Sequence, residues 1–172
     1  GELAGPASIV FDHSDVLFVS DHRNNRIQRF TKDGTFLSEF GCEGAGDGQF
    51  NLPWGITVSP SQDIYIADWR NDRIQRFSPK GDFIAKYGGS GSKEGELSRP
   101  SSIAVDEEGY MYVADWGNER IQVLDPEGGF VQTLRGEATL SPWAQQFLDA
   151  SPSEAAARLG ANLETAQNVR GE

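Results

Sequence analysis

Apolar and β-branched residues along the first 136 positions fall into short runs separated by glycine, proline, asparagine and aspartate. Runs of this length, bounded by turn-forming residues, predict β-strands. The pattern repeats every 47 residues, with four runs in each repeat. The first runs follow Pro6, Pro53 and Pro100 at 8–11, 55–58 and 102–105; the second are 16–20, 64–67 and 111–114; the fourth are 36–40, 83–87 and 130–134. The first runs, which are continuously apolar, are expected to form strands buried on both faces.

A polar motif, Asp-x-x-Asn-x-Arg-Ile-Gln, follows the second run of every repeat and leads into the third. Its fixed residues are Asp21, Asn24 and Arg26 in the first copy, Asp68, Asn71 and Arg73 in the second, and Asp115, Asn118 and Arg120 in the third. The motif predicts the turn of an antiparallel hairpin, with the aspartate closing one strand opposite the arginine that opens the next. Asn71 suits the positive-φ position of a tight turn. We expect each ion pair to be structural and to hold its own sheet together.

Four short strands per repeat, joined by turns at Gly34, Gly81 and Gly128, are typical of a β-propeller blade. The fold class predicted is therefore all-β, with three four-stranded blades at about 5–41, 52–88 and 99–136. Glycine-rich segments, 41–50 and 88–97, join successive blades. We expect them to be flexible surface loops anchored by Phe50 and Leu97.

The repeat pattern ends near Gly136, and residues 137–172 predict a short α-helical tail or an insertion between blades. Ser141-Pro142 and Ser151-Pro152 each place serine at an N-cap and proline at the first helical position. Ser151 and Glu154 form a capping box.

The repeated residues resemble the NHL repeat. The second copy carries the resemblance most fully, with Gly48-Gln49-Phe50, Pro53, Gly55-Ile56, Ile64 to Asp68 and Asn71-x-Arg73-Ile74-Gln75. The resemblance covers residues 5–136 and implies an open-channel, WD40-like β-propeller, usually of six blades. It also implies mainly binding roles, such as protein or RNA recognition and sensing, and less often lyase activity in peptide-amidating enzymes.

Three blades are too few to close a propeller, because closed rings hold about four to eight. Further blades therefore lie outside this sequence, or two copies meet head to tail as a homodimer. The predicted tail resembles a helical insertion of bacterial NHL proteins and favours the first alternative. The N-terminus lacks the basic and apolar regions of a signal peptide, which favours a cut end.

The composition argues against several kinds of partner and binding site. The chain has 26 acidic and 15 basic residues and a net charge of −11, which opposes binding of nucleic acid. The single cysteine, Cys42, allows neither an intrachain disulfide nor a cysteine-based zinc site. No apolar run is long enough to span a membrane. The only histidines, His13 and His22, do not have metal-ligand spacing. The sequence thus predicts no catalytic residue, metal site or cofactor, and it does not indicate a compartment.

The variable positions around the motif are the candidate contacts for a ligand. In propellers the motif hairpins and the connecting loops share one rim, and that rim carries His22, Arg23, Trp54, Trp69, Arg70 and Trp116. Tryptophan and arginine are enriched in interaction hot spots. We therefore predict a non-catalytic recognition scaffold that binds a protein or a small ligand. In one alternative the tryptophans pack between blades. In another, the chain is part of a lyase or lactone-hydrolase propeller whose catalytic residues lie elsewhere.

Overall fold

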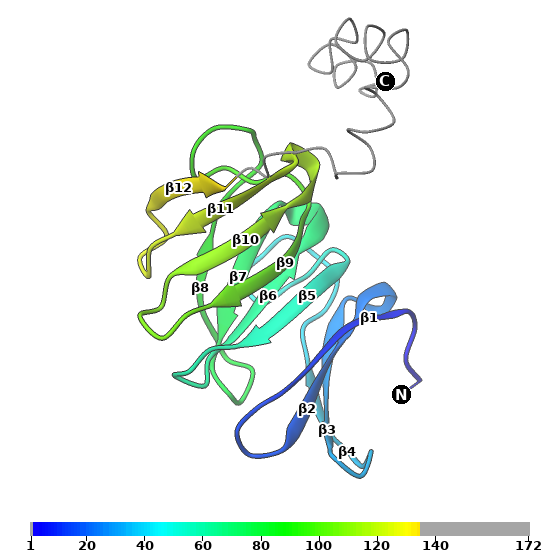
Figure 1. Cartoon of the computed structure of the whole chain (residues 1–172). Helices are drawn as coiled ribbons and strands as arrows, with labels where there is room; N and C mark the ends of the chain where they lie inside the picture. Colours follow the sequence, from blue (N-terminus) through cyan, green and yellow to red (C-terminus); the bar gives the residue numbers. More distant parts are fainter. Residues whose placement is uncertain (1, 135–172) are drawn as a thin grey trace, which may run out of the picture. The chain divides into compact units, whose positions relative to one another are not determined.

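The computed structural model describes residues 2–134, which form three four-stranded antiparallel sheets (Figure 1). Blade 1 contains β1 (Pro6–Phe11), β2 (Val16–Asp21), β3 (Arg26–Thr31) and β4 (Phe36–Phe40). Blade 2 contains β5 (Pro53–Val58), β6 (Ile64–Asp68), β7 (Arg73–Phe77) and β8 (Phe83–Tyr87). Blade 3 contains β9 (Pro100–Val105), β10 (Met111–Asp115), β11 (Arg120–Leu124) and β12 (Phe130–Leu134). The predicted all-β class with three four-stranded blades is confirmed. The predicted helices lie outside the described residues.

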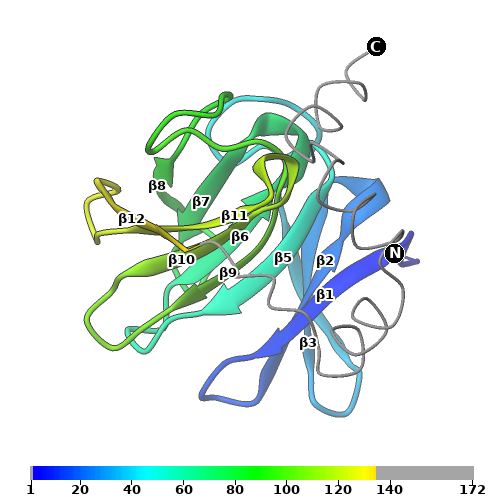
Figure 2. The same cartoon turned by 45° about the horizontal axis from the view of Figure 1, so that its top comes forward.

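Within each blade the strands lie in chain order, and the first strands of neighbouring blades contact one another. β1, β5 and β9 lie side by side, and the other strands of each sheet extend away from them (Figure 2). The blades therefore stack face against face, as blades of a propeller do.

The hydrophobic core lies between the blades rather than within any one of them. One buried cluster joins blades 1 and 2 and comprises Phe18, Ile27, Phe50, Ile56, Ile64, Ile66 and Phe77. A second joins blades 2 and 3 and comprises Tyr65, Ala67, Ile74, Tyr87, Leu97, Ile103, Met111, Val113 and Leu124. Phe50 and Leu97, the loop residues expected to be anchors, are both fully buried in these clusters. Each blade is thus stabilised by apolar area that its neighbour covers.

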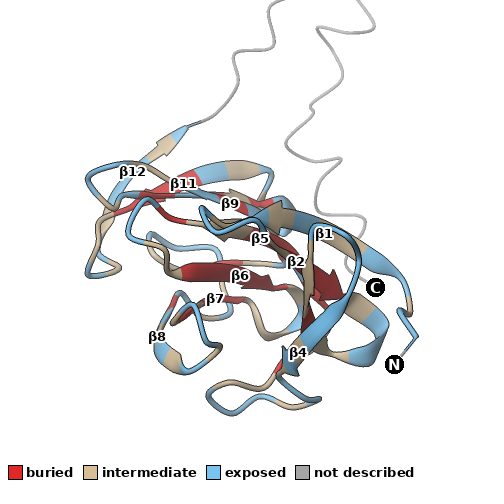
Figure 3. Cartoon of the chain, turned by 90° about the horizontal axis from the view of Figure 1, so that it is seen from below, coloured by how far each residue is buried: buried red, intermediate tan, exposed pale blue. Residues whose placement is uncertain are grey.

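The first strands are not buried on both faces as their apolar runs predicted. β1 has only exposed and partly buried residues, and buried and exposed residues mix along β5 and β9, whereas every residue of β6 is buried (Figure 3). β6 lies between β5 and β7 in the middle sheet, with a blade on each of its faces. Complete burial is therefore found in the second strand of the middle blade and not in the first strands.

The prediction for Asn71 is also wrong. Asn71 ends a 3-10 turn, η2 (Trp69–Asn71), and the positive φ of 53° belongs to the next residue, Asp72. Asn25 and Glu119 occupy the same left-handed position in blades 1 and 3. The Asn71 side chain serves instead as a hydrogen-bond donor, described below.

Candidate functional site

The polar motif forms a buried hydrogen-bond cluster, here called the clasp, made by the Asp, Asn, Arg and Gln of each copy. Asp68 lies opposite Arg73 across the β6–β7 hairpin. Asp68 Oδ2 accepts hydrogen bonds from Asn71 Nδ2 at 2.8 Å, Arg73 Nε at 2.8 Å and Gln75 Nε2 at 3.1 Å. Its Oδ1 accepts one from the Asn51 backbone amide at 2.8 Å. Both oxygens of the carboxylate are therefore hydrogen-bonded, as a buried charge requires.

The other two clasps repeat this geometry. Asp21 Oδ2 accepts from Asn24 at 2.9 Å, Arg26 at 2.8 Å and Gln28 at 2.9 Å. Asp115 Oδ2 accepts from Asn118 at 2.8 Å, Arg120 at 2.7 Å and Gln122 at 3.2 Å. All three aspartate side chains are completely buried.

Each of the second and third clasps also holds the loop that enters its blade. Arg73 donates to the backbone carbonyls of Ala45, Gly46 and Gln49, and Asn71 donates to that of Gly44. Arg120 donates in the same way to the carbonyls of Lys93 and Glu96. The connecting loops, expected to be flexible, are therefore fixed to the blade that follows them, because their carbonyls satisfy buried arginine donors.

Burial sets the protonation behaviour of these carboxyls. Burial raises the pKa of Asp68, against the hydrogen bonds from Asn51, Asn71 and Arg73 that lower it. For Asp21 the same kinds of donor outweigh burial, and its pKa is lowered. The difference follows from position, since blade 2 is covered on both faces and blade 1 on only one.

Four rings form a continuous line across the rim, here called the aromatic strip: His22, Trp54, Trp69 and Trp116. The His22 and Trp54 ring centroids are 4.8 Å apart, those of Trp54 and Trp69 5.5 Å, and those of Trp69 and Trp116 6.4 Å. His22, Trp69 and Trp116 begin the 3-10 turns η1 (His22–Asn24), η2 and η3 (Trp116–Asn118), and Trp54 is the second residue of β5. The repeat thus places one ring of the strip at the same point of each blade.

The strip is exposed to solvent. Trp116 is 59% exposed and Trp54 is 39% exposed, while His22 and Trp69 are partly buried. The alternative in which the tryptophans are buried between blades is therefore wrong for Trp54 and Trp116. Their contacts do cross from blade to blade, but along the surface.

Arginines flank the centre of the strip. The Cζ atom of Arg70 lies 5.8 Å from the Trp69 ring centroid and that of Arg99 lies 5.3 Å from it. In such a cation–π contact the positive guanidinium is attracted to the face of the aromatic ring. Arg23, also exposed, lies near enough to His22 to lower its pKa. The structure thus brings all six predicted rim residues onto one surface.

Sequence reasoning missed Arg99. Its repeat counterparts are Gly5 and Leu52, so no shared chemistry marked the position. Arg99 has a φ of +50°, a conformation that costs a non-glycine residue free energy. Its backbone amide donates to Asp72 Oδ1 at 2.7 Å, which holds the turn and presents the guanidinium to Trp69.

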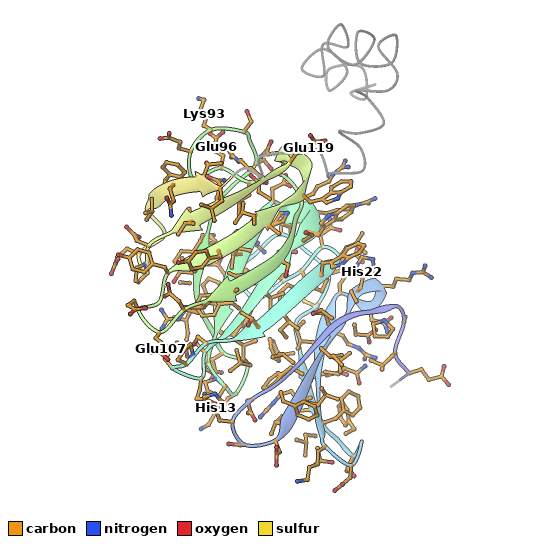
Figure 4. The ribbon with its side chains drawn as sticks, viewed as in Figure 1. His13, His22, Lys93, Glu96, Glu107 and Glu119 are labelled. Carbon is orange, nitrogen blue, oxygen red and sulfur yellow. The ribbon has the colours of Figure 1, made fainter. Side chains whose placement is uncertain are left out.

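The pKa of His22 is lowered from its ordinary value. Burial lowers it most, and the positive charges of Arg23 and Arg70 lower it further, against a hydrogen bond with the Pro53 backbone that raises it. Its buried Nδ1 has no hydrogen-bond partner within residues 2–134. Figure 4 shows His22 at the rim end of the blades and His13 at the opposite end, so the two histidines cannot share a ligand. In the part of the chain that the structure describes, no group of three or more His, Cys, Asp or Glu could hold a metal ion.

A hollow of about 190 Å³ lies between blades 2 and 3 near the turns that precede β6 and β10. Its walls include Ser59, Tyr65, Arg76 and the acidic residues 106–108. The Arg76 guanidinium is already paired with Asp63, so the hollow offers no unpaired cation to an anionic ligand.

None of the described helices is long and apolar enough to cross a membrane.

Comparisons with known proteins identify one repeat and several structures of similar fold. Residues 50–77 match the NHL repeat family. Streptogramin B lyase has a TM-score of 0.62 at 20% identity, over 79% of this chain and 42% of that one. Hydrazine synthase of Kuenenia stuttgartiensis has a TM-score of 0.62 at 18% identity, over 84% and 41%. The WD40 repeats of RRP9 have a TM-score of 0.64 at 13% identity, over 80% and 41%. A comparison with curated proteins found no match.

These similarities concern the fold alone, and the chain spans less than half the length of the structures it resembles. They include an enzyme and a WD40 repeat protein, so the same blades serve different functions. Residues 50–77, which include β5, β6, η2 and β7, match the NHL repeat. The three stacked four-stranded sheets of the described part have the fold of β-propeller blades.

Proposed function

We propose that the chain is a recognition module that binds a short segment of a partner protein on the rim formed by the aromatic strip with Arg23, Arg70 and Arg99. The observation that carries the proposal is the exposure of Trp54 and Trp116 in a line of contacting rings. Large apolar side chains of this kind are usually covered, and an exposed group of them indicates a binding surface.

The chemistry of the rim suits a segment with an apolar side chain next to a carboxylate. Tryptophan presents a large rigid surface at low cost in side-chain entropy, and arginine pairs with carboxylates in a fixed geometry. Arg70 and Arg99 already contact the Trp69 ring, which orders their guanidinium groups before a ligand arrives. Such preorganisation favours affinity.

A lyase or hydrolase role within a longer ring is the competing proposal, and the fold of streptogramin B lyase supports it. Acid–base or metal chemistry needs converging titratable groups. The rim of the described blades offers one histidine, His22, which lies against the Trp54 ring, is hydrogen-bonded with the Pro53 backbone and lies near two arginines. The binding proposal uses those contacts directly.

Selection of a displayed random-peptide library on the purified chain tests the proposal. Selected peptides are expected to combine Asp or Glu with Trp, Phe or Leu. Trp69→Ala and Arg70→Glu are each expected to weaken their binding by about ten-fold or more, the size of a hot-spot contact. Lys80→Glu reverses an exposed charge on the turn between β7 and β8 and is the matched control, with affinity unchanged. Failure to select binders, or equal affinity for all variants, would overturn the proposal.

A further inference from the structure

Blade 1 exposes a face that the other blades bury. This leading face comprises Leu3, Ile9, Phe11 and Phe36, all of them exposed. Its repeat counterparts are Phe50, Ile56, Val58 and Phe83 in blade 2, and Leu97, Ile103, Val105 and Phe130 in blade 3. Ile9 is 63% exposed, whereas Ile56 is 7% and Ile103 is 5% exposed. The difference arises because blades 2 and 3 each have a preceding blade packed against this face.

Blade 3 exposes the opposite face. This trailing face comprises Tyr112, Ile121 and Leu134, which are also exposed. The counterparts are Tyr65, Ile74 and Tyr87 in blade 2, and Phe18, Ile27 and Phe40 in blade 1. Ile121 is 41% exposed, whereas Ile74 and Ile27 are completely buried. In the first two blades a following blade covers this face.

The two exposed faces are the two halves of one kind of interface. Ile27 of a trailing face and Ile56 of a leading face belong to the same buried cluster. One blade further along, Ile74 and Ile103 again share a cluster. The partner that fits the leading face of blade 1 is therefore a trailing face of the same repeat, and the chain itself carries one.

We infer that a second copy of this chain covers both faces, with the leading face of each copy packed on the trailing face of the other. The two contacts are related by a two-fold axis and close a ring of six blades. This arrangement removes both apolar patches from water at once, whereas a single contact would leave one patch exposed on each copy. The inference does not rest on the proposed function, because no residue of the aromatic strip belongs to either face.

Sedimentation velocity of the full chain over a concentration series tests the inference. The wild-type chain is expected to be a dimer that dissociates on dilution. Ile9→Asp and Ile121→Lys each place a charge in both contacts of a homodimer, so each variant alone is expected to be a monomer. Ile84→Asp is the matched control, because Ile84 is an exposed isoleucine of β8 whose counterparts Leu37 and Val131 are equally exposed.

Mixing the two variants gives the sharper result. A mixed dimer has one contact in which the introduced aspartate faces the introduced lysine, and a second contact that is entirely wild type. An equimolar mixture of Ile9→Asp and Ile121→Lys is therefore expected to recover a dimer containing both chains, while neither forms one alone. A wild-type chain that stays monomeric over the concentration series would overturn the inference. A dimer that survives both substitutions, or a mixture that stays monomeric, would overturn it as well.

Discussion

Each clasp carboxylate acts on two parts of the chain at once. Asp68 joins the ends of β6 and β7 through Arg73 and fixes the incoming loop through the Asn51 amide. Arg73 in turn uses its remaining donors on loop carbonyls. Removing the carboxylate would therefore leave a buried guanidinium without its counter-charge and free the Asn51 amide.

We predict that Asp68→Ala lowers the free energy of unfolding by about 3–5 kcal/mol, the cost of stranding one partner of a buried ion pair. Chemical denaturation followed by circular dichroism measures the change. Lys32→Ala is the control, because the Asp15–Lys32 pair is exposed and such pairs contribute little to stability. Equal midpoints for the two variants would contradict this role of the clasp.

His22 predicts a dependence of stability on pH. Its folded-state pKa lies below the ordinary value of 6.5, so the unfolded chain binds a proton that the native chain does not between those two values. The free energy of unfolding should therefore rise as pH rises through that interval and be independent of His22 above 6.5.

Denaturation of the wild-type chain and of His22→Phe at a series of pH values isolates this contribution. The stability difference between them should change only below the ordinary histidine pKa. A nuclear magnetic resonance titration of His22 with a midpoint at or above 6.5 would show that the ring is not held neutral.

At the scale of elements, much of the fold follows from the repeated pattern. The fourth strands have the bounds predicted for them, because each follows a turn whose glycine, Gly34, Gly81 or Gly128, has a positive φ. The first strands begin earlier than predicted, at Pro6, Pro53 and Pro100. Their burial was misjudged because an apolar run does not reveal which blade is covered on both faces. Arg99 and the loop–clasp bonds depend on contacts about 27 residues apart, which a local pattern does not contain.

Two glycines with the same backbone conformation but different surroundings test how tightly the connections between strands are packed. Gly34 and Gly88 have nearly equal φ values, 83° and 82°. A Cβ atom at Gly34 would meet nothing within 4 Å, whereas one at Gly88 would lie 2.5 Å from Leu97 Cδ1.

We predict that Gly34→Ala costs about 1–2 kcal/mol from backbone strain alone. Gly88→Ala should cost a further 1–3 kcal/mol, roughly the penalty for overpacking, because Leu97 is fully buried in the second core. Thermal and chemical denaturation of both variants give the comparison. Equal losses would mean that the loop moves freely enough to admit the methyl group.

The whole molecule is an array in which each blade is stabilised by its neighbours. Blade 2 has a core on both faces and blades 1 and 3 have one each. Local stability should therefore be highest in blade 2, since opening an end blade exposes fewer buried contacts than opening the middle one.

We predict that amide hydrogen exchange of the dilute chain is slowest in β6 and β7 and faster in β1, β4 and β12. Mass spectrometry of peptic fragments at a series of exchange times measures it. Uniform exchange over the three blades would contradict the array description and indicate a single cooperative unit.

The position of the clasps within the repeat has a consequence for how such chains grow. Arg73 and the carbonyls of residues 45, 46 and 49 lie in one span, from Gly41 to Tyr87, and Arg120 has its acceptors in the next. A gene duplication that copies this span transfers donor and acceptor together, so the new unit arrives with its polar groups already matched. A duplication that begins at Pro53 would divide them. Recombination at the boundary before Gly41 would therefore lengthen or shorten the array without separating an arginine from its loop acceptors.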